Sequence, residues 1–386
     1  MIINENDALD FKDVTTPKEI PSLFVKGFMM GSADVVPGVS GGTMALILGI
    51  YQRLIDAIKS VDTQTLKSLL SLRISDVFKQ VHWFFLVVLL SGILSAIMFV
   101  TRVIKLPELM FTNPEPVYGL FFGLIIGSVW YVLKGLGKLT VGNVMWIIVG
   151  TAIGFRVVTL VPTDTPEAMW FIFLSGSLAI TAMILPGISG SFILLILRKY
   201  DYILMQFGKL GGPETMDALW VLVPFGLGLV IGIMLFSRVL SWLLHHYYAI
   251  TLCVLIGFMI GSLYVIWPFQ DREYAESIRS EQVEFNDPII HELRTNPEST
   301  RKPEYKKLGP PSKSTETVEV LTVKQKLIHS EPFIPLWSKA DSDDRLHNGR
   351  NSIIYSVVMM LVGIGVIIII FLLERRKLTS KQAEFP

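Results

Sequence analysis

The chain has 386 residues, of which 51% are hydrophobic and only 17% are charged, and its formal net charge is +1. Ordinary soluble domains carry about 25% charged residues, so the composition excludes a typical soluble domain and predicts an integral membrane protein. The near-zero net charge argues against a nucleic-acid partner, and the single cysteine, Cys253, excludes an intrachain disulfide.

The first 21 residues are polar and lack the basic and apolar regions of a cleaved signal peptide. We expect them to form a cytoplasmic tail, with the chain entering the membrane through its own spans. Six plain apolar runs follow, most of them about as long as the ~20 residues that a helix needs to cross a bilayer. These predicted spans are residues 83–104, 117–133, 142–161, 220–244, 249–267 and 352–373.

Two further apolar runs, 22–50 and 170–197, are interrupted by Pro37-Gly38 and Pro186-Gly187. Proline removes an amide donor and glycine loosens the backbone, so a helix should stop or kink at each pair. The arms, of roughly 11 to 16 residues, are about 17–24 Å long and fall short of the ~30 Å hydrocarbon core. Each run is therefore expected to form a re-entrant hairpin that enters and leaves the membrane on one side.

Three other segments are polar or amphipathic. Residues 51–82 carry apolar side chains at helical spacing and predict an amphipathic helix in the membrane interface. Residues 269–351 have mixed charge and no motif that suggests chemistry, and this composition predicts a poorly ordered loop or a small cap. Residues 374–386 are expected to form a cytoplasmic tail.

The second half of the chain repeats the first. ILPGISGSFILLILRKYDYIL (184–204) matches VVPGVSGGTMALILGIYQRLI (35–55), and GLVIGIMLFSRVLSW (228–242) matches GILSAIMFVTRVIKL (92–106). A third match, GFMIGSLYVIWP (257–268) with GLIIGSVWYVLK (123–134), follows in the same order. We infer a tandem duplication with repeats at 22–161 and 170–373, and interrupted helices at corresponding positions are typical of transporters.

Each repeat is expected to cross the membrane three times, and an odd number turns the second repeat upside down. Lysine and arginine favour the cytoplasmic side, where the inverted arrangement places the basic residues of 51–82, of 134–141 and of the C-terminal tail. Arg198, Lys199 and Lys209 fall outside and fit less well. The sequence predicts an all-α integral membrane protein of two inverted repeats, each a Pro-Gly-broken re-entrant helical hairpin plus three transmembrane helices, with 269–351 outside.

The helix that follows each break offers a site for an anion. Its first amides have no partner within the helix, and the helix dipole places partial positive charge there. Backbone amides and hydroxyls of this kind suit an oxyanion, above all phosphate. Candidate ligands are Ser40, Gly41, Gly42 and Thr43 in the first repeat and Ser189, Gly190 and Ser191 in the second. The alternative is that these residues only cap the helix and permit close packing.

Three charged residues lie near the predicted site. Arg102 and Arg238 correspond across the repeat, and a guanidinium can hold phosphate with two hydrogen bonds. Both lie late in their spans, where arginine often only reaches the headgroups. Asp34 precedes the first break and is the candidate for binding a coupling proton or sodium ion, or for pairing with arginine, although it could also lie in water at a hairpin end.

The stretch Gly38-Val39-Ser40-Gly41-Gly42 also fits G-x-S-x-G, the pattern around a hydrolase nucleophile. Such a serine needs a preceding strand, a histidine base and an acid, and no strand pattern precedes Ser40. The matching stretch of the second repeat loses the last glycine of the pattern. We therefore expect no catalytic residue, no cofactor and no metal.

Together, GSADVVPGVSGGTMALILGIYQRLIDAI and ILPGISGSFILLILRKYDYIL closely resemble the PopT-type polyprenyl-phosphate transporters of bacteria. The resemblance covers about residues 20–268 and 350–375. It implies a protein that moves undecaprenyl phosphate from the outer to the inner leaflet of the bacterial inner (cytoplasmic) membrane, recycling it for peptidoglycan and envelope polysaccharides. It also points to one further residue, Arg53, and to residues already named: Asp34, Pro37, Gly38, Ser40, Gly41, Gly42, Pro186, Gly187, Ser189 and Gly190.

Other functions remain open on sequence grounds. A secondary transporter of a small soluble anion would use the same helix tips. A phosphatase acting on the polyprenyl chain ranks lower, because no paired basic and histidine motif for a phospho-enzyme is present. A pure scaffold would not need two matched helix breaks.

Overall fold

The computed structural model describes residues 15–36, 40–60, 71, 82–160, 165–284, 286–295, 304–309 and 317–383. The chain divides into two compact units. The first comprises Met1–Ile104, Leu124–Ile266 and Ile364–Pro386, and the second comprises Lys105–Gly123 and Trp267–Gly363.

Six helices of the described chain are long and apolar enough to cross a membrane. They lie over the six plain runs of the sequence and make the chain a multi-pass membrane protein. They are α6 (Trp83–Arg102), α8 (Pro114–Gly135), α9 (Val141–Val158), α13 (Thr215–His246), α14 (Tyr248–Ile266) and α16 (Arg350–Ala383).

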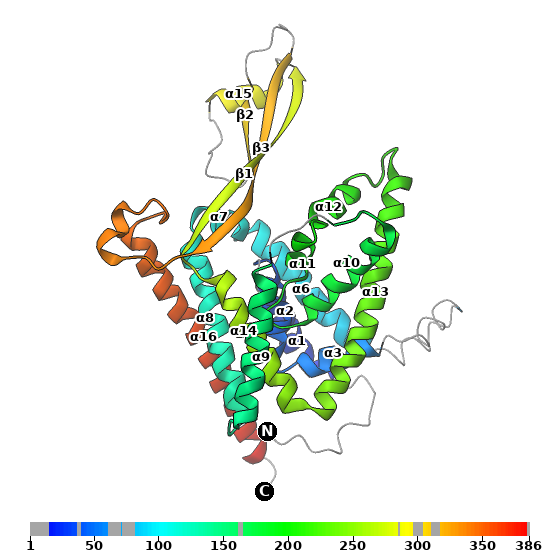
Figure 1. Cartoon of the computed structure of the whole chain (residues 1–386), viewed down its shortest axis with the longest axis vertical. Helices are drawn as coiled ribbons and strands as arrows, with labels where there is room; N and C mark the ends of the chain where they lie inside the picture. The colour runs from blue at the N-terminus through cyan, green and yellow to red at the C-terminus, as the bar shows by residue number, and fades with distance from the viewer. Residues whose placement is uncertain are drawn as a thin grey trace. The chain divides into compact units, whose positions relative to one another are not determined.

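Each interrupted run forms a long helix and a short helix separated by a break, and a second short helix follows directly after the run. The first set is α1 (Ile20–Asp34), α2 (Gly41–Ile47) and α3 (Tyr51–Lys59); the second is α10 (Met169–Ile184), α11 (Gly190–Ile196) and α12 (Tyr200–Gly208). Figure 1 shows them in blue and in green. At 1.5 Å per residue, the seven residues of α2 or α11 extend only about 10 Å. Neither short helix can cross a bilayer alone.

Both short helices end in the same way. Gly49 follows α2 with a φ of 66°, and Arg198 follows α11 with a φ of 50°. This left-handed conformation is easy for glycine and costs an arginine about 1–2 kcal/mol. The equivalent turns are therefore imposed by the fold, because the second half keeps the turn without keeping the glycine.

Helix packing in the first unit repeats residue by residue. A Cβ atom at Gly27 of α1 would lie 2.2 Å from the Leu89 carbonyl oxygen of α6, and one at Gly176 of α10 would lie 2.4 Å from that of Phe225 in α13. The second helix of each pair also contacts the first through a glycine. A Cβ atom at Gly92 of α6 would lie 2.3 Å from the Phe24 carbonyl oxygen, and one at Gly228 of α13 would lie 2.0 Å from that of Phe173. These contacts correspond at the offsets of the sequence repeat, so the two halves pack their first helices identically.

Two other helix pairs join the halves. In the first unit, Gly150 and Gly154 of α9 lie against Val254 and Phe258 of α14. Helices α8 and α16 pair in the same manner, with Gly123 against Met360 in the second unit and Gly127 against Ile367 in the first. Glycine lets helix backbones approach closely where lipid supplies no hydrophobic drive for association.

The second unit contains a sheet. Strands β1 (Gln270–Glu284), β2 (Glu304–Leu308) and β3 (Thr317–Pro332) form an antiparallel sheet in the order β1-β3-β2. β1 and β3 run side by side over their whole length, from Gln270 opposite Pro332 to Glu284 opposite Thr317 (Figure 1). The second unit also includes α7 (Leu106–Thr112), α15 (Pro288–Thr295) and the short 3-10 helix η3 (Trp337–Ser342). Another short 3-10 helix, η2 (Pro17–Glu19), belongs to the first unit. The segment 269–351, which the composition predicts to be a poorly ordered loop or a small cap, thus contains three strands that the sequence analysis does not predict.

The inverted orientation of the repeats and the re-entrant course of the hairpins remain predictions. Of the amphipathic segment predicted at 51–82, α3 is helical, whereas 61–70 and 72–81 lie outside the described residues. Lys67, Arg73 and Lys79, which carry part of the charge argument, are among those positions.

Candidate functional site

The start of α2 is packed against the end of α10 in the other half of the chain. The Ser40 hydroxyl lies 3.2 Å from the carbonyl oxygens of both Met183 and Leu185, and can donate its hydrogen to either. Between them, the Ile184 carbonyl accepts a hydrogen bond from the Tyr51 hydroxyl at 3.2 Å. These carbonyls end a helix and lack helical partners. Two hydroxyls of the first half therefore satisfy the helix end of the second half.

A further hydrogen bond joins α2 to the second break. The amide of Gly187 donates to the Thr43 hydroxyl at 3.0 Å. Ser40 and Thr43 are 2% and 1% exposed, and a Cβ at Gly42 would lie 2.4 Å from the Ile184 carbonyl oxygen. The structure therefore brings Ser40, Gly42 and Thr43 together with Gly187.

The tip of α2 is already occupied by side chains of the protein. The Gly41 amide donates to Asp34 Oδ1 at 2.6 Å, and the Gly42 amide donates to Ser40 Oγ at 3.1 Å. Asp34 thus lies against the amides that the sequence reading assigns to phosphate. An anion that binds these amides must displace its carboxylate.

The tip of α11 is different. Ser189 makes no capping hydrogen bond with its side chain, and its hydroxyl lies 2.8 Å from that of Ser191. Within the described ranges, no side chain accepts from the Gly190 amide in the way that Asp34 accepts from Gly41. The residue that corresponds to Asp34 is Met183, which is apolar. Ser189 is half-buried and Ser191 is exposed, whereas their counterparts Ser40 and Gly42 are buried, so the second tip is the more accessible one.

The proline–glycine pairs are described in one half only. Pro37 and Gly38 lie outside the described residues, whereas Pro186 and Gly187 are both buried in a turn. Gly187 has a φ of 84°, and a Cβ there would lie 2.8 Å from the Phe258 carbonyl oxygen of α14. Glycine is required at this position for both its backbone conformation and its close approach to α14.

The three arginines have separate surroundings. Arg53 donates to Glu19 Oε2 at 3.1 Å and to Thr15 Oγ1 at 2.7 Å, and its guanidinium lies 4.6 Å from the ring centre of Phe85. Arg238 Nη1 donates to the Met234 carbonyl of its own helix at 2.6 Å. Arg102 is the exposed last residue of α6. Their role in phosphate binding is a prediction that these contacts leave untested.

The structure shows a polar contact between α3 and α13 that the sequence analysis does not predict. The Ser241 hydroxyl donates to Asp56 Oδ1 at 2.9 Å and accepts from Lys59 Nζ at 3.2 Å. Ser241 is 1% exposed, and its carbonyl oxygen lies 2.7 Å from His245 Nδ1. The signal in the sequence is the i, i+3 spacing of Asp56 and Lys59, which places both side chains on one face of a helix.

The duplication allows this contact to be compared with its counterpart. Helices α3 and α13 correspond to α12 and α6, and these described helices do not pack together in a comparable way. Likewise α2 packs against α10, whereas its counterpart α11 makes no comparable contact with α1. In the described chain, each of these contacts is thus made at one of two equivalent places.

In the part of the chain that the structure describes, no group of three or more His, Cys, Asp or Glu side chains is placed to hold a metal ion. The site offers backbone amides, hydroxyls and one carboxylate. This chemistry fits the binding of an oxyanion by hydrogen bonds.

Known proteins are similar in sequence to this chain. A family model described as VCA0040-like, undecaprenyl phosphate translocase-like, matches residues 30–283. A polyprenyl-phosphate transporter of Vibrio cholerae serotype O1 is 40% identical over 250 residues, which are 65% of this chain and 78% of that protein. A polyprenyl-phosphate transporter of Staphylococcus aureus is 33% identical over 260 residues, 63% of this chain and 85% of that protein. No solved structure matches significantly.

Proposed function

Because the chain belongs to the VCA0040-like, undecaprenyl phosphate translocase-like family, we propose that it moves undecaprenyl phosphate from the outer to the inner leaflet of the bacterial cytoplasmic membrane. The carrier lipid would thereby return for peptidoglycan and envelope polysaccharide synthesis. The observation that carries this proposal beyond the family is the packing of Ser40 and Thr43 against the second break, which gathers polar backbone from both halves.

The physical demand of the reaction fits such a site. Moving a charged phosphate through hydrocarbon is costly unless polar groups replace its water. Irregular backbone is tolerated at membrane depth only where it is buried in protein or lines a polar cavity. Two breaks that meet inside a bundle of spans supply amides and hydroxyls for the phosphate, while the isoprenoid chain stays in lipid.

The difference between the two tips suggests an order of events. Ser189 and Ser191 at the tip of α11 are accessible, so the phosphate engages them first. Asp34 holds the Gly41 amide until it takes up a proton or a sodium ion. Once neutralised, the carboxyl is a weaker acceptor, and the α2 tip becomes free to share the phosphate. On this proposal Asp34 couples transport to a cation.

The α3–α13 contact suggests which side is closed. In the inverted arrangement, Asp56 and Lys59 of α3 and Ser241 near the end of α13 all lie at the cytoplasmic side. The described helices that correspond to α3 and α13 are α12 and α6, and they do not pack together in a comparable way. On this proposal the contact between α3 and α13 closes the cytoplasmic side, and the protein receives the lipid phosphate from the outer leaflet in this state.

The test is the surface exposure of undecaprenyl phosphate in cells whose other translocases have been removed. An antibiotic that binds the lipid phosphate in the outer leaflet reports exposure with and without this protein. We expect exposure to rise on deletion and to return to normal with the wild-type gene but not with Ser189→Ala. Unchanged exposure on deletion would refute the lipid assignment.

Two other functions are separated by reconstitution. Uptake of labelled phosphate or carboxylates into proteoliposomes would indicate a transporter of small soluble anions that uses the same tips. Release of inorganic phosphate from polyprenyl phosphate by the purified protein would indicate a phosphatase. The named relatives are transporters, so we expect neither result.

A further inference from the structure

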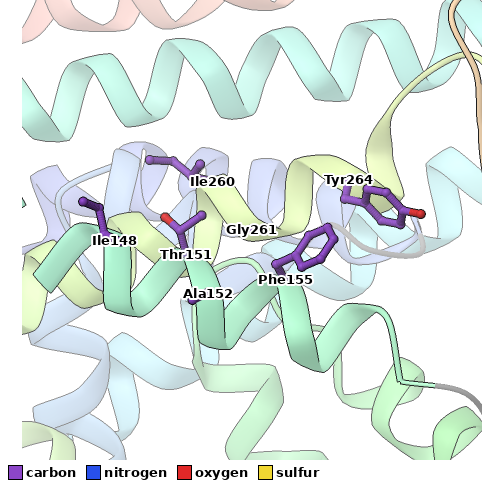
Figure 2. Close-up of a pocket in the computed structure, with 7 residues that line it drawn as sticks. All are labelled: Ile148, Thr151, Ala152, Phe155, Ile260, Gly261 and Tyr264. Atoms are coloured by element: carbon purple, nitrogen blue, oxygen red, sulfur yellow. The ribbon is translucent and has the colours of Figure 1, made fainter. Parts of the chain in front are cut away.

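An open groove runs between α9 and α14 in the first unit. Its walls and floor come from Ile148, Thr151, Ala152 and Phe155 of α9 and from Ile260, Gly261 and Tyr264 of α14, and its volume is about 380 Å³. Figure 2 shows the seven residues along two adjacent helices, with Phe155 and Tyr264 together at one end. The groove exists because glycines draw the backbones together: a Cβ at Gly261 would lie 2.6 Å from the Phe155 amide nitrogen.

The groove is lined by hydrocarbon. None of its seven residues is charged, and the Thr151 hydroxyl donates to the Ile147 carbonyl of its own helix at 2.8 Å. The rings of Phe155 and Tyr264 meet edge to face, with centroids 5.0 Å apart. Both helices are apolar enough to span the membrane. The medium that surrounds the groove is therefore hydrocarbon, and its occupant is an apolar chain.

The groove is close to the second break. Gly187 lies against Phe258 and Met259 of α14, and a Cβ atom added at Gly187 would lie 2.8 Å from the Phe258 carbonyl oxygen. The next residues along α14, Ile260 and Gly261, line the groove. One turn of α14 thus contacts the candidate phosphate site and also forms part of the groove. A lipid whose phosphate lies at the breaks would have the start of its tail within reach of this groove.

We propose that the α9–α14 groove binds the isoprenoid chain of the translocated lipid, an inference that rests on the proposed function. Lipid tails are as apolar as the groove, so binding here gains from close packing and not from leaving water. A preformed groove with two aromatic rings at one end distinguishes hydrocarbon chains by shape. Such a site would allow the protein to prefer a branched chain over the straight tail of another phosphate-bearing lipid.

The groove can be filled without disturbing the helix packing. Ala152 is exposed at its floor, so Ala152→Trp adds a ring inside the channel. The matched control is Ile153→Trp, because Ile153 is adjacent, 47% exposed and outside the lining. Equal expression and equal melting temperature of the two variants in detergent establish that both fold.

Translocation of undecaprenyl phosphate is measured in proteoliposomes for the wild-type protein and for both variants. We expect Ala152→Trp to slow translocation by about tenfold, the effect of an overpacked contact. Ile153→Trp should leave the rate near that of the wild-type protein. No slowing by Ala152→Trp, or equal slowing by both variants, would overturn the proposal.

A second measurement distinguishes the substrate tail from ordinary lipid. Photoreactive polyprenyl phosphate and photoreactive phosphatidylethanolamine, each with the reactive group in its chain, are cross-linked to the wild-type protein in nanodiscs, and the adducts are located by mass spectrometry. The proposal expects polyprenyl adducts on 148–155 and 260–264 that Ala152→Trp removes. Adducts from phosphatidylethanolamine alone would show a bulk-lipid groove and overturn it. Because this measurement needs no transport, it remains decisive even if translocation of undecaprenyl phosphate is not observed and the proposed function fails.

Discussion

The main-chain amide of Gly41 donates a hydrogen bond to the carboxylate of Asp34, seven residues earlier in the chain, across a distance of 2.6 Å. The acid before the first break therefore acts as the cap of the helix after it. This relationship places the one carboxylate of the candidate site at the point where the phosphate is expected, and it makes Asp34 the first residue to test.

Asp34→Asn should keep the helix cap and abolish coupling. Asparagine preserves an oxygen acceptor for the Gly41 amide but cannot exchange a proton or bind a cation through charge. We expect near-wild-type stability and a translocation rate that no longer responds to a pH or sodium gradient across proteoliposomes. Asp34→Ala should in addition lower stability by about 1–3 kcal/mol, because it leaves a buried amide without a partner. A wild-type gradient response in Asp34→Asn would rule out the coupling role.

Ser40→Ala and Ser189→Ala should differ although the residues correspond. Ser40 caps α2 and donates to the end of α10, so its loss should cost about 1 kcal/mol of stability together with activity. Ser189 makes no capping bond, and its loss should leave the melting temperature nearly unchanged. If Ser189 binds phosphate, translocation should still fall about tenfold or more. Full activity of Ser189→Ala would remove α11 from the site.

Gly27→Ala and Gly176→Ala should destabilise the protein to a similar extent. An added Cβ would lie 2.2 Å from the Leu89 carbonyl oxygen or 2.4 Å from that of Phe225, and such overpacking costs about 1–3 kcal/mol. Gly226→Ala is the matched control, since a Cβ on Gly226 meets nothing within 4 Å. Thermal unfolding in detergent should give lower melting temperatures for the first two variants only. A difference confined to one half would contradict equivalent packing.

Cross-linking Asp56→Cys to Ser241→Cys with a short thiol reagent should stop translocation. These side chains hydrogen bond at 2.9 Å, and the proposed cycle requires α3 and α13 to separate at the cytoplasmic side. The chain has one cysteine, Cys253, which is buried, so the reagent acts at the new pair. A cleavable reagent provides the control, because reduction should restore transport. Undiminished transport in the cross-linked protein would show that this contact is not a gate.

The helical part of the fold could be predicted because it depends on local patterns. Hydropathy located six spans to within a few residues, and Pro186-Gly187 marked the turn where α10 ends. The sheet was not foreseen because its strands are rich in charge and their partners are distant. Arg279 pairs with Thr322, for example, and no local period reveals that register.

The candidate site was predictable in part for the same reason. The repeated Pro-Gly-x-Ser-Gly pattern identified the residues that the structure brings together, such as Ser40 and Gly187. Sequence could not show that Asp34 folds back onto Gly41, because no standard cap spacing joins positions seven residues apart. Nor could it show that Arg53 is held by Glu19 and Thr15, which depends on how the N-terminal segment packs.

The exchange of helix partners between the halves has a consequence for how the protein is made. Helix α9 pairs with α14, and α8 pairs with α16, which follows the other five described spans in the chain. The glycine faces of α8 and α9 therefore stay without their partner helices in the membrane until about a hundred or more further residues have been inserted. Assembly of the bundle cannot be sequential. The pairing of α8 with α16 comes late, so a chain truncated before α16 would carry an unpaired α8 that quality-control proteases can recognise.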